Sequence, residues 1–193
     1  MSLRLSGGRR LQSPPGQTAR PTTSRVRLAV MNLLGEALPG CRWLDLCCGS
    51  GVMACEALQR GAAVVVAVDR DRRLVALART NLEAVRKGSS HDPALQVHGA
   101  DVLHWLARGR GELPPFDLIY VDPPYGAGLY GPIAAGVTAG QWLRPGGTMV
   151  WECASNAIPA VPAGWHCRDQ RRYGGCSLLL LEPEGLPGPP AVA

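Results

Sequence analysis

The feature that most limits the possible folds is a repeated change between short apolar runs and longer amphipathic stretches. Strands are expected at residues 41–46, 63–68, 95–98 and 116–121, and helices at residues 52–59, 73–85 and 102–107. Strands and helices that alternate in this way are typical of a parallel sheet covered by helices. Because the run Val64-Val65-Val66-Ala67-Val68 is apolar on both faces, we place it at the centre of a doubly wound α/β sheet.

The rest of the pattern completes this sheet and marks the ends of the domain. A helix is expected at residues 129–139, a strand at 148–153 after the turn Pro145-Gly146-Gly147, and closing strands near 165–173 and 177–182. A helix at residues 25–38 precedes the first strand. We therefore expect seven strands in a domain of residues 25–182. An irregular, basic, glycine- and proline-rich arm (1–24) precedes it, and a proline- and glycine-rich tail (183–193) follows it.

The composition is that of a globular enzyme, since 46% of the 193 residues are apolar and 18% are charged. No run reaches the length of about 20 apolar residues that a membrane span requires, and no segment resembles a signal peptide. The seven cysteines contain no Cys-x-x-Cys pair, so we expect them to be small buried side chains. These observations predict a cytoplasmic protein, expected to be a monomer, with no membrane segment and no metal site.

Positive charge is concentrated at the amino end. The formal net charge is +5; residues 1–35 contain six arginines and no acidic residue, and the remainder has 14 basic and 15 acidic residues. A basic arm of this kind suits a polyanion such as a nucleic acid. A solvated tail is the alternative interpretation. The six residues are Arg4, Arg9, Arg10, Arg20, Arg25 and Arg27.

A glycine-rich loop follows the first expected strand. The sequence Leu44-Asp-Leu-Cys-Cys-Gly-Ser-Gly51 leads into a helix, whose first N–H groups are available to a ligand that the glycines allow to approach closely. Acidic residues follow the next strands, and ligands of doubly wound sheets bind at the carboxyl ends of strands. The expected cofactor-binding residues are Asp45, Gly49, Ser50, Gly51, Asp69, Arg70, Asp101 and Val102.

Two cofactors suit this loop. Residues 49–54 satisfy the Gly-x-Gly-x-x-Gly/Ala fingerprint, and Asp69 stands where a ribose hydroxyl is expected, so an NAD-dependent oxidoreductase is one interpretation. Two further carboxylates, Asp45 and Asp101, favour S-adenosylmethionine, because an acid repels a pyrophosphate but not a sulfonium or an ammonium. Helix capping is the structural alternative for Asp69 and Asp101.

The sequence Val121-Asp122-Pro123-Pro124-Tyr125 is the strongest local signal. Its two prolines end the fourth strand and fix the next turn. An aromatic amine is a poor nucleophile and must be held in line with the donor; Asp122 and the Pro123 carbonyl can accept its two hydrogens. Tyr125 offers a face for stacking the target base. We therefore predict that Asp122, Pro123, Pro124 and Tyr125 form the reaction centre of a base-amine methyltransferase, with a plain proline turn as the alternative.

Three stretches of the chain resemble one family: Arg20-Pro-Thr-Thr-Ser-Arg-Val-Arg27, the glycine loop with its continuation Glu56-Ala-Leu-Gln-Arg-Gly-Ala62, and the Asp-Pro-Pro-Tyr turn. Residues 20–182 resemble the RsmD-type 16S ribosomal RNA guanine-N2 methyltransferases. These are Rossmann-like class I enzymes that use S-adenosylmethionine. The resemblance implies a seven-stranded, mostly parallel sheet with helices on both faces and an antiparallel last strand. It also implies an abbreviated basic amino-terminal hairpin at residues 4–11.

The same resemblance implies the substrate. Guanine would be held by residues 122–125, in 16S rRNA of a partly assembled small ribosomal subunit. RNA contacts are expected from Arg9, Arg10, Arg20, Thr22, Arg25 and Arg27, of which Arg25 could instead reach the carboxylate of the cofactor. Adenine N6 or another planar amine remains an alternative target. A nucleic-acid-binding module without catalysis is a more distant alternative.

Overall fold

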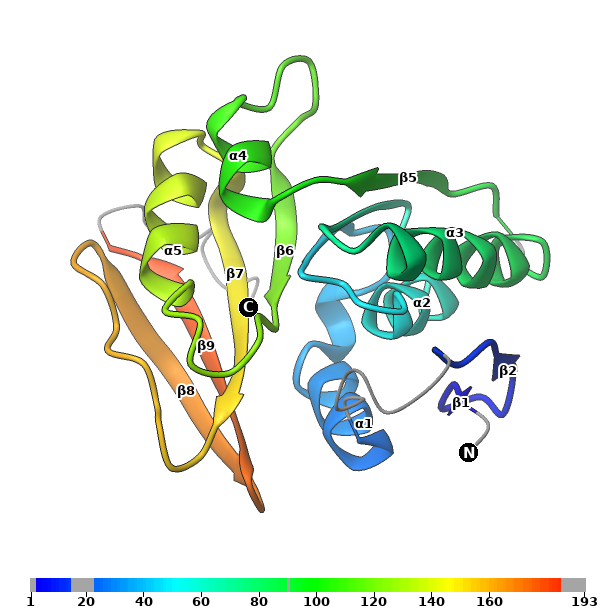
Figure 1. Ribbon diagram of the computed structural model, residues 1–193, viewed down its shortest axis with the longest axis horizontal. Helices are drawn as coiled ribbons and strands as arrows, with labels where there is room; N and C mark the ends of the chain where they lie inside the picture. The colour runs from blue at the N-terminus through cyan, green and yellow to red at the C-terminus, as the bar shows by residue number, and fades with distance from the viewer. Residues whose placement is uncertain (1–2, 15–22, 90, 185–193) are drawn as a thin grey trace, which may run out of the picture. The chain divides into compact units, whose positions relative to one another are not determined.

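The computed structural model describes residues 3–14, 23–89 and 91–184 (Figure 1). Contacts between residues group the chain into two compact units, Met1–Val102 and Leu103–Ala193. Strands and helices alternate in the first unit and through β6 of the second, as the sequence predicts. Among the described residues, no helix is both long enough and apolar enough to cross a membrane.

Three parallel strands form the sheet of the first unit, in the order β5 (Ala94–Gly99), β4 (Val64–Asp69), β3 (Arg42–Leu46). The register pairs Leu46 with Val68 and Asp69 with Gly99, so the three strands end at the same edge. The residues that follow these ends therefore lie at one edge of the sheet, where ligands of such folds bind.

Helices α1 (Ser24–Leu33), α2 (Val52–Gln59) and α3 (Arg72–Arg86) complete the first unit. Helix α3 begins at the cap Asp71, whose carboxylate accepts the N–H groups of Arg73 (2.8 Å) and Leu74 (3.3 Å). Its buried positions recur every three or four residues, so one face of the helix is turned inward. These positions are Val75, Ala78, Asn81, Leu82 and Val85. Helix α2 lies beside α3 and packs on β3 and β4 (Figure 1).

The amino-terminal arm is not wholly irregular, which corrects the expectation for residues 1–24. Strands β1 (Leu3–Arg4) and β2 (Arg10–Leu11) pair antiparallel and form a hairpin, here defined as residues 3–12. Leu5 and Leu11 are buried, and Gly8 takes a positive φ of 83° in the turn. Apolar contacts therefore hold the hairpin against the rest of the first unit, in addition to the polar contacts described below.

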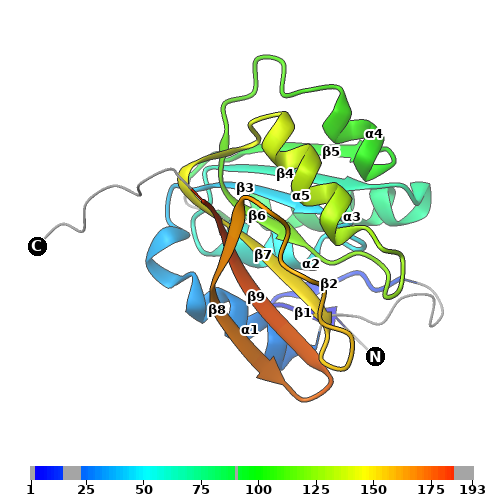
Figure 2. The same cartoon turned by 90° about the vertical axis from the view of Figure 1, so that its left-hand side faces the viewer.

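Four strands form the sheet of the second unit, in the order β6 (Phe116–Val121), β7 (Leu143–Ala154), β9 (Cys176–Pro183), β8 (Trp165–Tyr173) (Figure 2). Strands β6 and β7 are parallel, whereas β9 is antiparallel to both β7 and β8. Helix α5 (Tyr130–Ala139) belongs to this unit, and α4 (Val102–Ala107) spans the boundary between the units. The seven strands of the two units make up the seven-stranded, mostly parallel sheet that the sequence predicts.

Two predicted elements differ from the structure. The helix expected at residues 25–38 ends at Leu33 and is followed by a 3-10 turn, η1 (Gly35–Ala37), because the glycine interrupts the helical run. Strand β7 begins five residues before the expected 148, and Pro145-Gly146-Gly147 lies inside it. The register of β6 and β7 shifts between Phe116 and Leu118. Residues 145–147 of β7 therefore form an irregularity within the ladder rather than a turn before the strand.

The seven cysteines are all free thiols, and five of them are buried. Cys47 and Cys167 are partly exposed. The expectation that all seven are small buried side chains is therefore wrong for Cys47 and Cys167, and it is confirmed for Cys41, Cys48, Cys55, Cys153 and Cys176.

Candidate functional site

The glycine loop between β3 and α2 is held by two carboxylates of the first unit. Asp45, only 1% exposed, accepts the N–H of Ala54 in the first turn of α2 (3.0 Å). Asp69, at the end of β4, accepts the N–H of Gly49 (2.8 Å) with one oxygen and that of Asp71 (2.8 Å) with the other. The structure thus brings Asp45, Asp69 and the glycines together, as predicted.

The backbone of this loop has an unusual conformation. Positive φ angles occur at Cys47 (63°), Gly49 (55°) and Gly51 (73°). A β-carbon on Gly51 would lie 3.0 Å from the β-carbon of Ala78 on α3. Position 51 therefore excludes a side chain by both conformation and contact. Gly51 is also the N-cap of α2 and has no side chain with which to cap the helix, and Asp45 accepts one of its first N–H groups instead.

The charges around the loop are negative. Burial raises the pKa of the Cys48 thiol well above its ordinary value, and the nearby carboxylates of Asp45 and Asp69 raise it further. A negative potential at this point disfavours an anion and favours a cationic ligand.

The other predicted cofactor residues lie at the same edge of the first unit. Ser50 is partly buried within the loop, Arg70 is exposed after β4, and Asp101 is partly buried directly before α4, whose first residue, Val102, is buried. The N-cap of α3 is Asp71 and not Asp69. The alternative interpretation of Asp69 as the cap of the following helix is therefore wrong.

The Asp-Pro-Pro-Tyr turn lies at the end of β6 in the second unit. Asp122 is partly buried, Pro123 is buried, and Tyr125 exposes 45% of its surface. The N–H of Ala127 donates to the carbonyl of Pro124 (3.1 Å), which closes the turn. The structure therefore combines a partly buried carboxylate with an exposed aromatic ring within four residues.

Sequence reasoning missed a buried polar cluster behind this turn. Glu152 on β7 is 4% exposed and accepts a hydrogen bond from the hydroxyl of Tyr120. The hydroxyl of Tyr130 donates to the main-chain carbonyl of the same glutamate (2.6 Å). An acidic residue inside the apolar run Val150-Trp151-Glu152-Cys153 was the available signal.

The carboxylates of Asp122 and Glu152 raise the pKa values of side chains in this cluster. Burial raises the pKa of Cys153 to about 11, with smaller contributions from Glu152 and Asp122. Burial likewise raises the pKa of Tyr130, and Asp122 makes the next largest contribution. The carboxylates of Asp122 and Glu152 thus make the potential around this cluster more negative, which suits a ligand that presents N–H donors.

The predicted RNA-binding residues fall into three groups. Arg10 and Arg25 are exposed, on β2 and α1. Arg9 is exposed as well, but its Nη1 donates to the carbonyl of Ala84 at the end of α3 (2.7 Å). Arg27 is 5% exposed and bonded to Glu56, so its guanidinium cannot reach a phosphate without unfolding this region. Arg20 and Thr22 lie outside the described residues.

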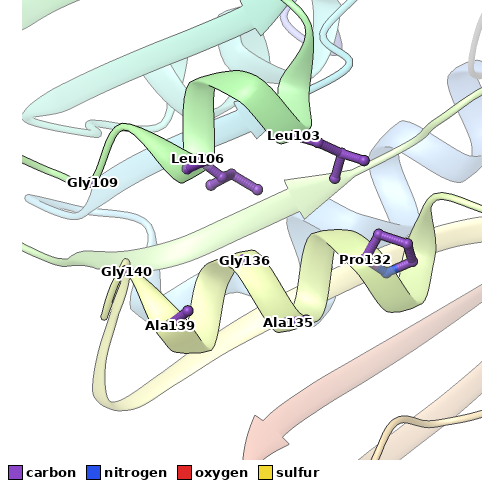
Figure 3. A pocket seen from close by; sticks show the side chains of 9 residues that line it. Leu103, Leu106, Gly109, Pro132, Ala135, Gly136, Ala139 and Gly140 are labelled. Carbon is purple, nitrogen blue, oxygen red and sulfur yellow. The ribbon is translucent and has the colours of Figure 1, made fainter.

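A hollow of about 490 Å³ opens in the second unit between α4 and α5 (Figure 3). Apolar side chains such as Leu103, Leu106 and Pro132 line it, and none of the predicted site residues that the structure describes does. In the part of the chain that the structure describes, no group of three histidine, cysteine or acidic residues could hold a metal ion.

Comparisons with known proteins agree with this geometry. The family model described as "Conserved hypothetical protein 95" (Cons_hypoth95) matches residues 5–182. The chain belongs to this family. The Cons_hypoth95 match includes the hairpin, the glycine loop and the Asp-Pro-Pro-Tyr turn.

Curated relatives of this Cons_hypoth95 chain carry methyltransferase names. "Ribosomal RNA small subunit methyltransferase D" of Escherichia coli (strain K12) is 29% identical over 178 residues, which cover 92% of this chain and 86% of that protein. The protein of the same name from Haemophilus influenzae is 25% identical over 91% of this chain and 89% of its own length.

Solved structures show the same fold. "Putative methyltransferase yhhF from Escherichia coli" is 28% identical, with a TM-score of 0.80 over 95% of this chain and 99% of that chain. The structure named "rRNA methyltransferase aviRa from Streptomyces viridochromogenes" is 19% identical, with a TM-score of 0.66, and supports the fold alone. The α/β, Rossmann-like fold class predicted from the sequence is confirmed.

Proposed function

We propose that this protein transfers a methyl group from S-adenosylmethionine to the exocyclic N2 amine of a guanine in 16S rRNA. The observation that carries the proposal is the turn after β6, where the partly buried Asp122 and the exposed ring of Tyr125 are three residues apart in the chain. Relatives along most of the chain are named small subunit rRNA methyltransferases, which supports this reaction and substrate class. A cytoplasmic location, where ribosomal RNA is found, belongs to the same proposal.

The first unit supplies a site that fits the cofactor. An added β-carbon on Gly49 would meet nothing within 4 Å, so this glycine leaves room for a ligand before the start of α2, and the field of Asp45 and Asp69 favours a cationic one. S-adenosylmethionine carries an ammonium and a sulfonium, and when bound it supplies an electrophilic methyl group. Asp45, Gly49, Gly51, Asp69 and Asp101 would hold it, with Ser50, Arg70 and Val102 adjoining. Because NAD carries a pyrophosphate, the same field opposes its binding.

Gly51→Ala tests this site. We expect the dissociation constant for S-adenosylhomocysteine, the demethylated cofactor, to rise at least about tenfold, because the positive φ and the contact with Ala78 force the loop to move. Isothermal titration calorimetry measures the change. Gly40→Ala is the matched control, since Gly40 has a φ of 74° but nothing within 4 Å of an added β-carbon. Equal affinity in the two variants would contradict the assignment of the loop.

The second unit supplies the groups that hold the target. The carboxylate of Asp122 and the carbonyl of Pro123 accept the two amino hydrogens and orient the nitrogen lone pair toward the donor. Once the nitrogen gains the methyl group it becomes acidic, and a weakly basic carboxylate suffices to accept its proton. Orientation is therefore the main task of Asp122.

Tyr125→Ala tests the stacking role. Stacking of a base on an aromatic side chain contributes roughly 1–3 kcal/mol, so we expect kcat/KM for RNA to fall about 10- to 100-fold. Tyr125→Phe retains the ring and is expected to stay within about threefold of the wild type. Because the ring is 45% exposed, neither change should lower the melting temperature by more than a few degrees. Equal activity of both variants would remove stacking from the proposal.

The reaction itself is tested with tritiated S-adenosylmethionine and either naked 16S rRNA or small subunits from cells that lack the enzyme. We expect label in N2-methylguanosine after nuclease digestion. Label in N6-methyladenosine or in another nucleoside would retain the fold and the cofactor but change the target. If the protein neither transfers label nor binds S-adenosylhomocysteine, the methyltransferase assignment fails, and titration with NADH would test the oxidoreductase alternative.

A further inference from the structure

We infer that Asn81 is a positioning residue that links the amino-terminal hairpin to the cofactor loop, so that seating of the hairpin and binding of the cofactor strengthen each other. The inference rests on the proposed function, because it assumes that the glycine loop binds S-adenosylmethionine. All the residues that carry it belong to the first unit.

The first observation is the hydrogen bonding of the Asn81 side chain, which is 1% exposed. Its Nδ2 donates both to the carbonyl of Gln12 and to the carbonyl of Ser50, each at 3.1 Å. Its Oδ1 accepts the N–H of Gln12 at 2.9 Å. One buried amide therefore pairs with the last residue of the hairpin, as a neighbouring strand would, and also holds the glycine loop.

The second observation is the position of Ser50 between two glycines of positive φ, Gly49 at 55° and Gly51 at 73°. Glycines impose few conformational limits of their own, so contacts with neighbouring residues determine the path of the loop. The N–H of Gly49 is bonded to Asp69, and Gly51 lies against Ala78. Ala78 is one helical turn before Asn81 on α3, so one face of that helix supports the loop at two successive residues.

The third observation concerns the other polar anchors of the hairpin, of which one is the bond from Nη2 of Arg27 to the carbonyl of Arg4 (2.6 Å). The N–H and hydroxyl of Ser6 donate to Glu56 (2.9 and 2.6 Å), and Arg9 donates to the carbonyl of Ala84 (2.7 Å). Asn81 is the anchor that also contacts the loop. If the hairpin leaves α3, the amide loses two of its three hydrogen bonds, and the orientation of its remaining bond to Ser50 is no longer fixed.

Thermodynamic linkage makes the effect mutual. A hairpin that holds Asn81 in place keeps the loop in one geometry, and a ligand that grips the loop must stabilise the hairpin by the same factor. A nucleic acid bound to the exposed Arg10 of the hairpin would then raise the affinity for the cofactor.

The test measures binding of S-adenosylhomocysteine to the full chain by calorimetry. Asn81→Asp keeps the size and the acceptor for the Gln12 N–H but turns an oxygen toward two carbonyls, so we expect the dissociation constant to rise about tenfold or more. Gln12→Pro removes that N–H without touching the loop and should raise the dissociation constant about threefold to tenfold. Thr80→Ala, an exposed neighbour on α3, is the control and should not change it.

Two further measurements separate coupling from a general loss of stability. In Asn81→Ala, adding Gln12→Pro should cause no additional loss of affinity, because the link is already broken. S-adenosylhomocysteine should slow hydrogen exchange of hairpin amides such as those of Leu5 and Gly8 in the wild type, and should not do so in Asn81→Ala. If an Asn81 variant does not fold, Gln12→Pro carries the test alone.

The outcomes are distinguishable. A wild type that does not bind S-adenosylhomocysteine overturns the proposed cofactor. A wild type that binds it, while Gln12→Pro binds equally well and the hairpin exchanges at the same rate with and without ligand, overturns the coupling and leaves the cofactor in place.

Discussion

Replacement of Asp122 by alanine is expected to lower kcat for methyl transfer about 1,000-fold, because removing a preorganised hydrogen-bonding group from a reaction centre typically has an effect of this size. The side chain is partly buried at the end of β6, where the prolines that follow hold the backbone in place. The amine would lose one of its two acceptors and rotate out of line with the methyl donor. Single-turnover kinetics with tritiated cofactor measures the chemical step directly.

Asp122→Asn separates orientation from basicity. The amide oxygen still accepts a hydrogen bond, so we expect a loss of only about tenfold if orientation dominates. Asp117→Asn, near the start of the same strand, is the matched control, since Asp117 pairs with Arg144 far from the turn along β6. Affinity for S-adenosylhomocysteine should be unchanged in all three variants. Near-normal turnover by Asp122→Ala would move the reaction centre away from this residue.

Replacement of Glu56 by alanine should have the largest effect on stability. Glu56 is fully buried on α2 and accepts hydrogen bonds from Ser6 and from Arg27, which is itself 5% exposed. Removing one partner of a buried ion pair leaves the other charged and unpaired, at a cost of about 3–5 kcal/mol. For a chain of this size the melting temperature should fall by roughly 10 °C or more. Differential scanning calorimetry measures the change.

Two control experiments show whether the loss of stability in Glu56→Ala comes from burial of the ion pair. Glu83→Ala removes the partner of Arg86 on α3, where both side chains are about 40% exposed (42% and 40%), and should change stability by less than about 1 kcal/mol. The double variant Arg27→Met/Glu56→Leu should regain much of the lost stability, because neither charge then remains buried. A fall of less than 2 °C, about 1 kcal/mol or less, for Glu56→Ala would show that the pair is more hydrated than its burial indicates.

Most of the fold follows from local sequence patterns. The helices at residues 52–59 and 102–107 and the strands at 116–121 and 165–173 match the structure residue for residue. Each is a clear periodic run bounded by glycine, proline or a charged residue, so its limits depend on nearby residues. The predicted start of β7 was wrong because a proline and two glycines normally end a strand. In the structure, β7 pairs with β6 on both sides of these three residues.

The candidate site was predicted to different degrees. Asp69 and the glycines were expected to lie close together because a fold of this class places strand ends at one edge, and the structure shows Asp69 bonded to Gly49. The seating of the hairpin was not predicted, because it depends on Arg27, Glu56 and Asn81, which come from three different helices. Contacts between distant segments leave little trace in local patterns. The sequence indicated these contacts only through an acidic residue, Glu56, and an amide, Asn81, on otherwise apolar helix faces.

The burial of Arg27 changes the expected dependence of RNA binding on ionic strength. Six arginines in the first 35 residues imply up to six phosphate contacts, but Arg27 is bonded to Glu56 and Arg9 shares its guanidinium with the end of α3. Each phosphate contact that is not made reduces the loss of RNA affinity between 50 and 200 mM salt by about threefold. The arginine count of the arm therefore overstates how steeply added salt should weaken RNA binding.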